Sequence, residues 1–211
     1  MNEIREIGIE KELFLNDIKT DTLKEPKLYG FPYDEMGFLV EIRSLPSDRL
    51  YPVLTTLAQE EWQYKLRANK FDMELHDWSF AYGDKSWIDD IAERYKIYSF
   101  EDLTQNIYSK DKKVESHHLG IFPEGETCYK LTSGMHVHFS SRDSKTGKVI
   151  DLPIEKIVEK MDELFENEIL ESQRIKGEWE PKIHGFEYRS LPCNINVLKV
   201  LKEAFKILRS V

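Results

Sequence analysis

The chain has 211 residues, a length that fits one domain with a sizeable core. Hydrophobic residues make up 40% and charged residues 33% of it, and the formal net charge is −9 at pH 7. An acidic chain repels nucleic acid phosphates, and no Lys/Arg-rich run is interleaved with aromatic residues, so we do not expect a nucleic-acid-binding module. Nucleotide binding is not excluded, because a bound metal can reverse the local field.

Targeting and redox signals predict a cytoplasmic location. The first residues, MNEIREIGIEKEL, are too charged for a signal peptide, and no apolar run approaches transmembrane length. The two cysteines, Cys128 and Cys193, form no CxxC pair, which is typical of free thiols in a reducing compartment. We therefore expect a cytoplasmic protein without a membrane partner.

Strand and helix patterns follow one another irregularly along the chain. In order they are strand 4–15, strand 37–45, helix 47–69, strand 71–75, helix 85–98, strand 130–140, helix 151–175, strand 183–191 and helix 196–209. The helix at 151–175 is expected to be the longest, and the polar stretch 100–127 is expected to be a loop or a lid. Because strands and helices do not alternate regularly, we predict an α+β fold with a mainly antiparallel sheet.

Four of these strands carry functional side chains on one face and apolar side chains on the other, since successive strand residues point to opposite sides of a sheet. The polar pairs are Glu10 and Glu12 in GIEKELFL, Glu41 and Arg43 in GFLVEIRSL, His136 and His138 in GMHVHFS, and Glu187 and Arg189 in GFEYRSL. Any one pair would suit an ordinary solvated face. Four pairs together favour a functional site.

A short repeat links two of these strands, EIRSLP at 41–46 and EYRSLP at 187–192. A good strand-to-helix connection explains Ser-Leu-Pro but not the Glu-x-Arg before it. Carboxylates from separate strands bind Mg²⁺ or Mn²⁺, imidazole suits Mn²⁺, and arginines bind phosphate or carboxylate through two parallel bonds. These groups are the ones used in phosphoryl transfer. Neither GxxxxGK[ST] nor GxGxxG occurs, so we expect metal and side chains to hold the phosphates.

The same segments resemble those of glutamine synthetases. GIEKELFLND resembles that family's Gly-x-Glu-x-Glu-Phe-Phe-x-x-Asp segment, SGMHVHFS its Gly-Ser-Gly-Met-His-Val-His signature, and FEYRSLPCNIN its later Glu-x-Arg segment, in the same order. The chain is far shorter than a glutamine synthetase and looks more like the compact phage-type COOH·NH2 ligases (amidoligases) of the glutamine synthetase and glutamate–cysteine ligase superfamily. This implies a single catalytic domain over 1–211, with a curved antiparallel sheet of the glutamine synthetase type and helices on one face.

The resemblance implies metal ligands at five positions. Glu10, His136 and Glu187 would ligate the metal that bridges the nucleotide phosphates. Glu12 would ligate a second metal nearer the acceptor carboxylate. Glu41 matches a place where the family supplies further metal-ligand glutamates.

Nucleotide and substrate contacts are implied as well. His138 would contact phosphate, and Arg189 would bind the γ-phosphate or the acyl phosphate, acting in catalysis together with Glu187. Arg43 has no family counterpart, and the repeat assigns it to substrate carboxylate or phosphate. A further arginine of the family has no evident match, for which Arg142 and Arg174 are alternatives.

The expected activity is therefore that of an ATP-dependent carboxylate–amine ligase, with ATP and two or more Mg²⁺ or Mn²⁺ ions as cofactors. Its substrates would be a small-molecule or peptide carboxylate and an amine. The alternatives are a metal-dependent phosphotransferase of the guanidino-kinase type and a non-catalytic nucleotide-binding protein. The sequence names neither substrate and leaves a homo-oligomer open, and we expect specificity to come from residues 29–36 and 100–127.

Overall fold

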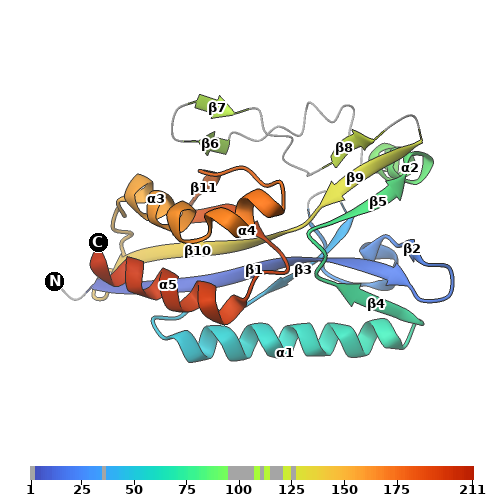
Figure 1. Ribbon diagram of the computed structural model, residues 1–211. Coiled ribbons are helices and arrows are strands. Elements are labelled where there is room, and N and C mark those ends of the chain that lie inside the picture. Colours follow the sequence, from blue (N-terminus) through green and yellow to red (C-terminus); the bar gives the residue numbers. More distant parts are fainter. Residues whose placement is uncertain (1–2, 35–36, 95–106, 110–111, 115–120, 125–126) are drawn as a thin grey trace.

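A large, curled antiparallel sheet forms the centre of the fold (Figure 1). The computed structural model describes residues 3–34, 37–94, 107–109, 112–114, 121–124 and 127–211. Within these ranges the sheet has seven strands, namely β1 (Glu3–Asp17), β2 (Thr22–Leu23), β3 (Leu39–Arg43), β4 (Met73–His76), β10 (Gly134–Asp143), β11 (Trp179–Lys182) and β12 (Gly185–Pro192). The predicted α+β fold with a mainly antiparallel sheet is confirmed.

Strand β1 organises this sheet, because its 15 residues pair along both edges. Residues 3–11 pair with β10, and residues 14–17 pair with β4 farther along the same edge. On the opposite edge, residues 10–14 pair with β3, and the last two residues pair with β2. Strands β12 and β11 extend the sheet beyond β10, so polar residues from distant parts of the sequence become neighbours.

Four helices pack on one face of the sheet and are called the helix layer here: α1 (Leu50–Asn69), α3 (Ile154–Leu164), α4 (Glu166–Glu171) and α5 (Val197–Ser210). Strand residues of one parity fill the core beneath them, including Ile7, Ile9, Leu13, Met135, Val137, Phe139, Phe186 and Tyr188. Burial of each such side chain contributes roughly 1.5–3 kcal/mol. None of the helices in the described residues is long and apolar enough to span a membrane.

A smaller sheet covers the opposite face at the far end of β1. It consists of β5 (Phe80–Asp84), β8 (Ile121–Glu124) and β9 (Cys128–Thr132), and α2 (Lys85–Arg94) packs with it. Phe14 of β1 lies in this second core with Ile88 and Leu131. A short hairpin, β6 (Ile107–Ser109) and β7 (Lys112–Val114), and a 3-10 turn, η1 (Pro26–Tyr29), complete the described elements.

Several predicted elements need correction. The helix expected at 151–175 is two helices, because Phe165 takes a non-helical conformation with φ −119° and ψ 21°, and α1 is the longest helix described. The strand expected at 130–140 is divided at Ser133 between two sheets. Residues 100–127, expected as a loop, contain β6, β7 and β8, and apart from Thr127 the rest of that stretch lies outside the described residues, as do residues 35–36 and 95–98.

Candidate functional site

The polar pairs predicted from the sequence meet on the sheet face opposite the helix layer, called the site face here. Glu10 of β1 lies directly between His136 of β10 and Arg43 of β3 in the strand register, and His138 lies opposite Glu187 of β12. A β-bulge in the β10–β12 ladder brings Arg189 beside His136, since two residues of β12 face one of β10 there. The eight predicted residues therefore belong to one patch on four adjacent strands.

His136 is the centre of this patch and is only 1% exposed. Its Nδ1 atom lies 2.8 Å from Oε1 of Glu187 and 3.2 Å from Oε1 of Glu10. Burial and the Arg189 charge favour the neutral ring, but the carboxylates of Glu12, Glu187 and Glu10 outweigh them and raise the pKa of His136 to about 9. The ring is therefore protonated at neutral pH in the metal-free protein.

The second nitrogen of His136 is unusual. Nε2 is buried without a hydrogen-bond partner and lies 3.8 Å from Oε2 of Glu12. A buried polar atom without a partner costs free energy, so its presence in a cluster of carboxylates is typical of a site that binds a ligand.

Glu10 and Glu187 are buried carboxylates that remain ionised. Burial opposes their charge, but hydrogen bonds from His136 and His138 to Glu10 hold its pKa well below the usual range. For Glu187, burial is likewise outweighed by the charge and hydrogen bond of His136 and by the Arg189 charge. Arg43 Nε lies 2.8 Å from Oε2 of Glu10, and Arg189 Nη1 lies 2.6 Å from Oε1 of Glu187. Positive side chains thus compensate both carboxylates.

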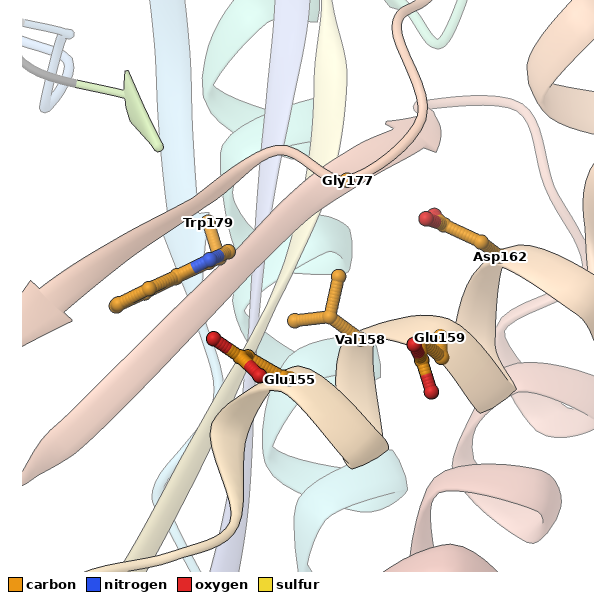
Figure 2. Close-up of a pocket in the computed structure, with 6 residues that line it drawn as sticks. All are labelled: Glu155, Val158, Glu159, Asp162, Gly177 and Trp179. Carbon is orange, nitrogen blue, oxygen red and sulfur yellow. The ribbon is translucent and has the colours of Figure 1, made fainter. Parts of the chain in front are cut away.

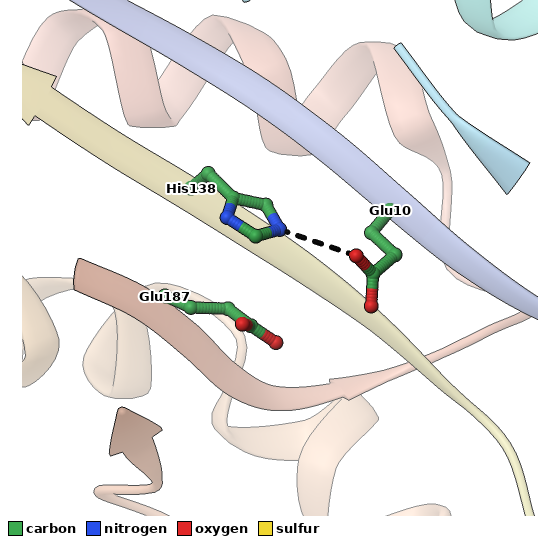
Figure 3. Close-up of side chains that lie close together, drawn as sticks. All are labelled: Glu10, His138 and Glu187. Carbon is green, nitrogen blue, oxygen red and sulfur yellow. Dashed lines mark ion pairs between the residues drawn. The ribbon is translucent and has the colours of Figure 1, made fainter. Parts of the chain in front are cut away.

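A group suited to a divalent cation lies within this patch. Figure 3 shows Glu10, His138 and Glu187 pointing toward one another from three neighbouring strands, and their ligand atoms all lie within 4.8 Å of each other. His138 Nε2 is 3.5 Å from Oε2 of Glu10. Two carboxylates and one imidazole fit Mn²⁺ or Mg²⁺. The group contains His138, for which a phosphate contact was expected, while His136 lies beside it and bonds to both carboxylates.

Glu12 and Glu41 form a second pair of carboxyl groups beside Glu10 and Glu187. They are opposite each other in the register, and Glu41 pairs with the exposed Arg43 side chain. Burial and the nearby charge of Glu10 raise the pKa of Glu41 to about 8, so this carboxyl group holds a proton at neutral pH. A metal ion bound there would relieve the same repulsion.

Gly134 leaves the space in which these groups meet. Its N–H donates to Oε2 of Glu12 at 2.7 Å. A Cβ atom at this position would lie 2.8 Å from Arg174 Nη2 and 2.9 Å from His136 Nε2. Any larger residue would therefore push the guanidinium group or the imidazole ring away.

Several contributors were not found from the sequence. Glu180 and Lys182 of β11 bond to Arg189 and Glu187, at 3.3 Å and 2.7 Å respectively. Strand β11 has only four residues and includes a proline, so the sequence did not predict it. The signal that could have revealed it is the segment WEPK, which precedes a turn containing His184 and Gly185 and places alternate side chains on opposite faces as a strand does.

The two alternatives for a further arginine are separated by the structure. Arg174 donates to the backbone oxygens of Ser133 and Arg189, at 3.2 Å and 2.7 Å, and so belongs to the patch. Arg142 instead pairs with Glu6 at 3.1 Å, near the far end of β10.

A surface pocket lies elsewhere, between α3 and the start of β11 (Figure 2). It is lined by Glu155, Val158, Glu159, Asp162, Gly177 and Trp179. Trp179 packs edge-on against the core residue Phe186, at a centroid distance of 6.1 Å, on the helix-layer side of the sheet. The pocket includes none of the site residues predicted from the sequence, and we assign it no role.

The patch can hold a divalent cation through carboxylates and imidazole, and it can bind an anion through the guanidinium groups of Arg43 and Arg189. It is built by pairing of β1 with β10, in which Glu10 and His136 are 126 residues apart in the sequence, and by pairing of β10 with β12. Comparisons of this chain with models of protein families, with curated proteins and with solved structures found no match.

Proposed function

We propose that the protein is an ATP-dependent carboxylate–amine ligase, similar to the phage-type COOH·NH2 ligases of the glutamine synthetase and glutamate–cysteine ligase superfamily. The observation that supports this most is the meeting of Glu10, His136, His138, Glu187 and Arg189 on one face of three adjacent antiparallel strands. The proposal includes a sheet of the glutamine synthetase catalytic-domain type, on which the resemblance places these same residues.

The carboxylates and histidines of the patch are proposed to bind metal, and its arginines are proposed to bind anionic groups. Glu10, Glu187 and the histidines would hold Mg²⁺ or Mn²⁺, and the bound ion would offset the repulsion between a triphosphate and an attacking carboxylate. Arg189 is fixed by Glu187 and Glu180 and binds the γ-phosphate through its planar guanidinium group. Arg43 is 65% exposed at the side chain, so it is accessible to the substrate carboxylate.

The proposed reaction has two steps. An oxygen of the substrate carboxylate attacks the γ-phosphorus of ATP, the bond to the bridging oxygen breaks, and ADP leaves. The nitrogen of the amine then attacks the acyl carbon, and inorganic phosphate and a proton are released as the amide forms. Positively charged groups arranged in advance stabilise the charge that develops in each transition state.

The test is ADP release by the purified protein with Mg²⁺ or Mn²⁺, against pooled carboxylates with and without pooled amines. ADP formation that needs both pools, together with a product of amide mass, is expected. Glu187→Gln should lower turnover by orders of magnitude, whereas Glu168→Gln, in a surface ion pair with Lys199 on the helix layer, should not. Unchanged turnover in Glu187→Gln would contradict the assignment.

Two other outcomes decide between the alternatives. A phosphorylated amine or guanidine formed without any carboxylate would identify a phosphotransferase. Metal-dependent ATP binding without turnover against any pool would show a working nucleotide site, with either a substrate missing from the pools or a non-catalytic nucleotide-binding protein as its explanation.

A further inference from the structure

Lys182 has no assigned function in the ligase reaction proposed above, yet its side chain contacts Glu187, a candidate metal ligand. Its Nζ atom lies 2.7 Å from Oε2 of Glu187 and 2.9 Å from Oε2 of Glu180. The lysine is at the end of the edge strand β11, whose hairpin with β12 places Glu180 opposite Glu187. An ammonium group is therefore held against the carboxylate on which the metal site depends.

The two oxygens of Glu187 have different neighbours. Oε1 forms ion pairs with Nδ1 of His136 and with Nη1 of Arg189. Oε2 is bonded to Lys182. Oε1 is thus committed to two other groups, and Oε2 is the oxygen that a metal ion can take by displacing one side chain.

Lys182 is also the cation best able to move. Both Arg189 and Lys182 pair with Glu180 and Glu187, but the Arg189 side chain is only 17% exposed and ends in a rigid planar guanidinium group. The Lys182 side chain is 29% exposed and ends in a compact ammonium group on a flexible four-carbon stem. Displacing Lys182 therefore disturbs the structure less than displacing Arg189.

A metal ion and this ammonium group cannot both keep close contact with Glu187 at low cost. The ligand atoms of Glu10, His138 and Glu187 lie within 4.8 Å of each other, so an ion among them would be adjacent to Lys182. Two like charges at a few ångströms repel strongly in a partly buried site. The ammonium group has to move toward solvent, where the phosphates of a metal-bound nucleotide would lie.

We propose that Lys182 is a displaceable counter-ion and a phosphate-binding residue. In the metal-free protein it neutralises Glu187, and when a divalent cation takes that carboxylate its ammonium group turns to the nucleotide phosphates. The second part rests on the proposed function, whereas the first concerns the metal alone. Lys182 accordingly opposes metal binding in the absence of nucleotide and supports nucleotide binding once the metal is present.

The test uses Lys182→Met, which keeps the apolar stem and removes the charge, and Lys182→Arg, which keeps the charge. Lys199→Met on α5, remote from the site face, is the matched control because Lys199 also pairs with a glutamate, Glu168, at 2.6 Å. Mn²⁺ affinity is measured by electron paramagnetic resonance of the free ion without nucleotide. Affinity for a non-hydrolysable ATP analogue is measured by calorimetry at saturating Mn²⁺, and thermal unfolding of each variant checks the fold.

Opposite changes are expected in the two measurements. Lys182→Met should bind Mn²⁺ about tenfold more tightly and the analogue about tenfold more weakly than the wild type, as for loss of one charge-assisted contact. Lys182→Arg should restore analogue affinity, and Lys199→Met should change neither. Equal affinities, or changes of the same sign, in a folded Lys182→Met protein would overturn the proposal. A wild type that binds no Mn²⁺ would overturn the metal site itself, and with it the proposed function.

Discussion

Glu41 and Glu187 face the same site, but replacing each by glutamine should change the stability of the protein in opposite directions. Burial and the charge of Glu10 raise the pKa of Glu41 to about 8. The pKa of Glu187 is instead lowered, because His136 and Arg189 outweigh the effect of burial. In the metal-free protein, Glu41→Gln should therefore increase the free energy of unfolding, and Glu187→Gln should decrease it.

The expected size follows from the titration of each group. The unfolded chain ionises Glu41 with the ordinary pKa of 4.5, and keeping a proton on such a group at pH 7 costs roughly 3 kcal/mol. Because Glu41 is partly exposed, solvent screening lowers the expected gain in Glu41→Gln to about 2 kcal/mol.

For Glu187, the amide of Gln would turn a donor toward either Lys182 or the His136 and Arg189 pair. Removing one partner of a buried ion pair costs about 3 kcal/mol. Because the pKa of Glu187 is lowered on folding, this carboxylate contributes to the free energy of unfolding above pH 4.5, and the contribution is lost as the pH falls below that value.

Urea unfolding at pH 7 with a chelator, followed by the same titration with saturating Mn²⁺, measures both effects. Mn²⁺ should stabilise the wild type, and it should stabilise either variant less, because each has lost a carboxylate from the acidic patch. A Glu41→Gln protein less stable than the wild type without metal, or a Glu187→Gln protein more stable, would refute the electrostatic account of the site.

Three further predictions concern pH, backbone conformation and thiol reactivity. Because the pKa of His136 is raised from 6.5 to about 9, the metal-free protein should lose stability as the pH rises from 6.5 through 9, while Mn²⁺ affinity rises over the same range. His136→Gln should reduce both trends in urea unfolding and metal titration, and the part that remains below pH 8 belongs to Glu41. Gly185→Ala should cost more than about 3 kcal/mol, since its φ is 152° and a Cβ would overlap a backbone carbonyl of β10, whereas Gly147→Ala, with φ 69° and open space, should cost only about 1–2 kcal/mol in the same assay. Burial raises the pKa of Cys193 to about 12, so a thiol reagent at pH 8 should label Cys128 in the native protein and Cys193 only after unfolding, and rapid native labelling of Cys193 would contradict its burial.

The sequence by itself determined which side chains share a face. Alternation along a strand is a local property of the backbone, so GIEKEL, GMHVHF and GFEYRS each predict their polar pair without knowledge of the fold. The same holds for α1 and α5, where the apolar spacing predicted the helices to within three residues at each end. Local patterns were less informative at Phe165, because Ile157, Met161, Phe165 and Ile169 keep a regular spacing of four through the break between α3 and α4.

Only the tertiary structure decided which faces meet. The register that puts Glu10 between His136 and Arg43, and the bulge that turns Arg189 toward His136, depend on pairing between strands far apart in the sequence. Lys182 became a neighbour of Glu187 through the short strand β11. Such pairings are set by packing of the whole core against the helices and not by the preferences of any one segment, which is why the polar pair on each strand could be predicted but the contacts between strands could not.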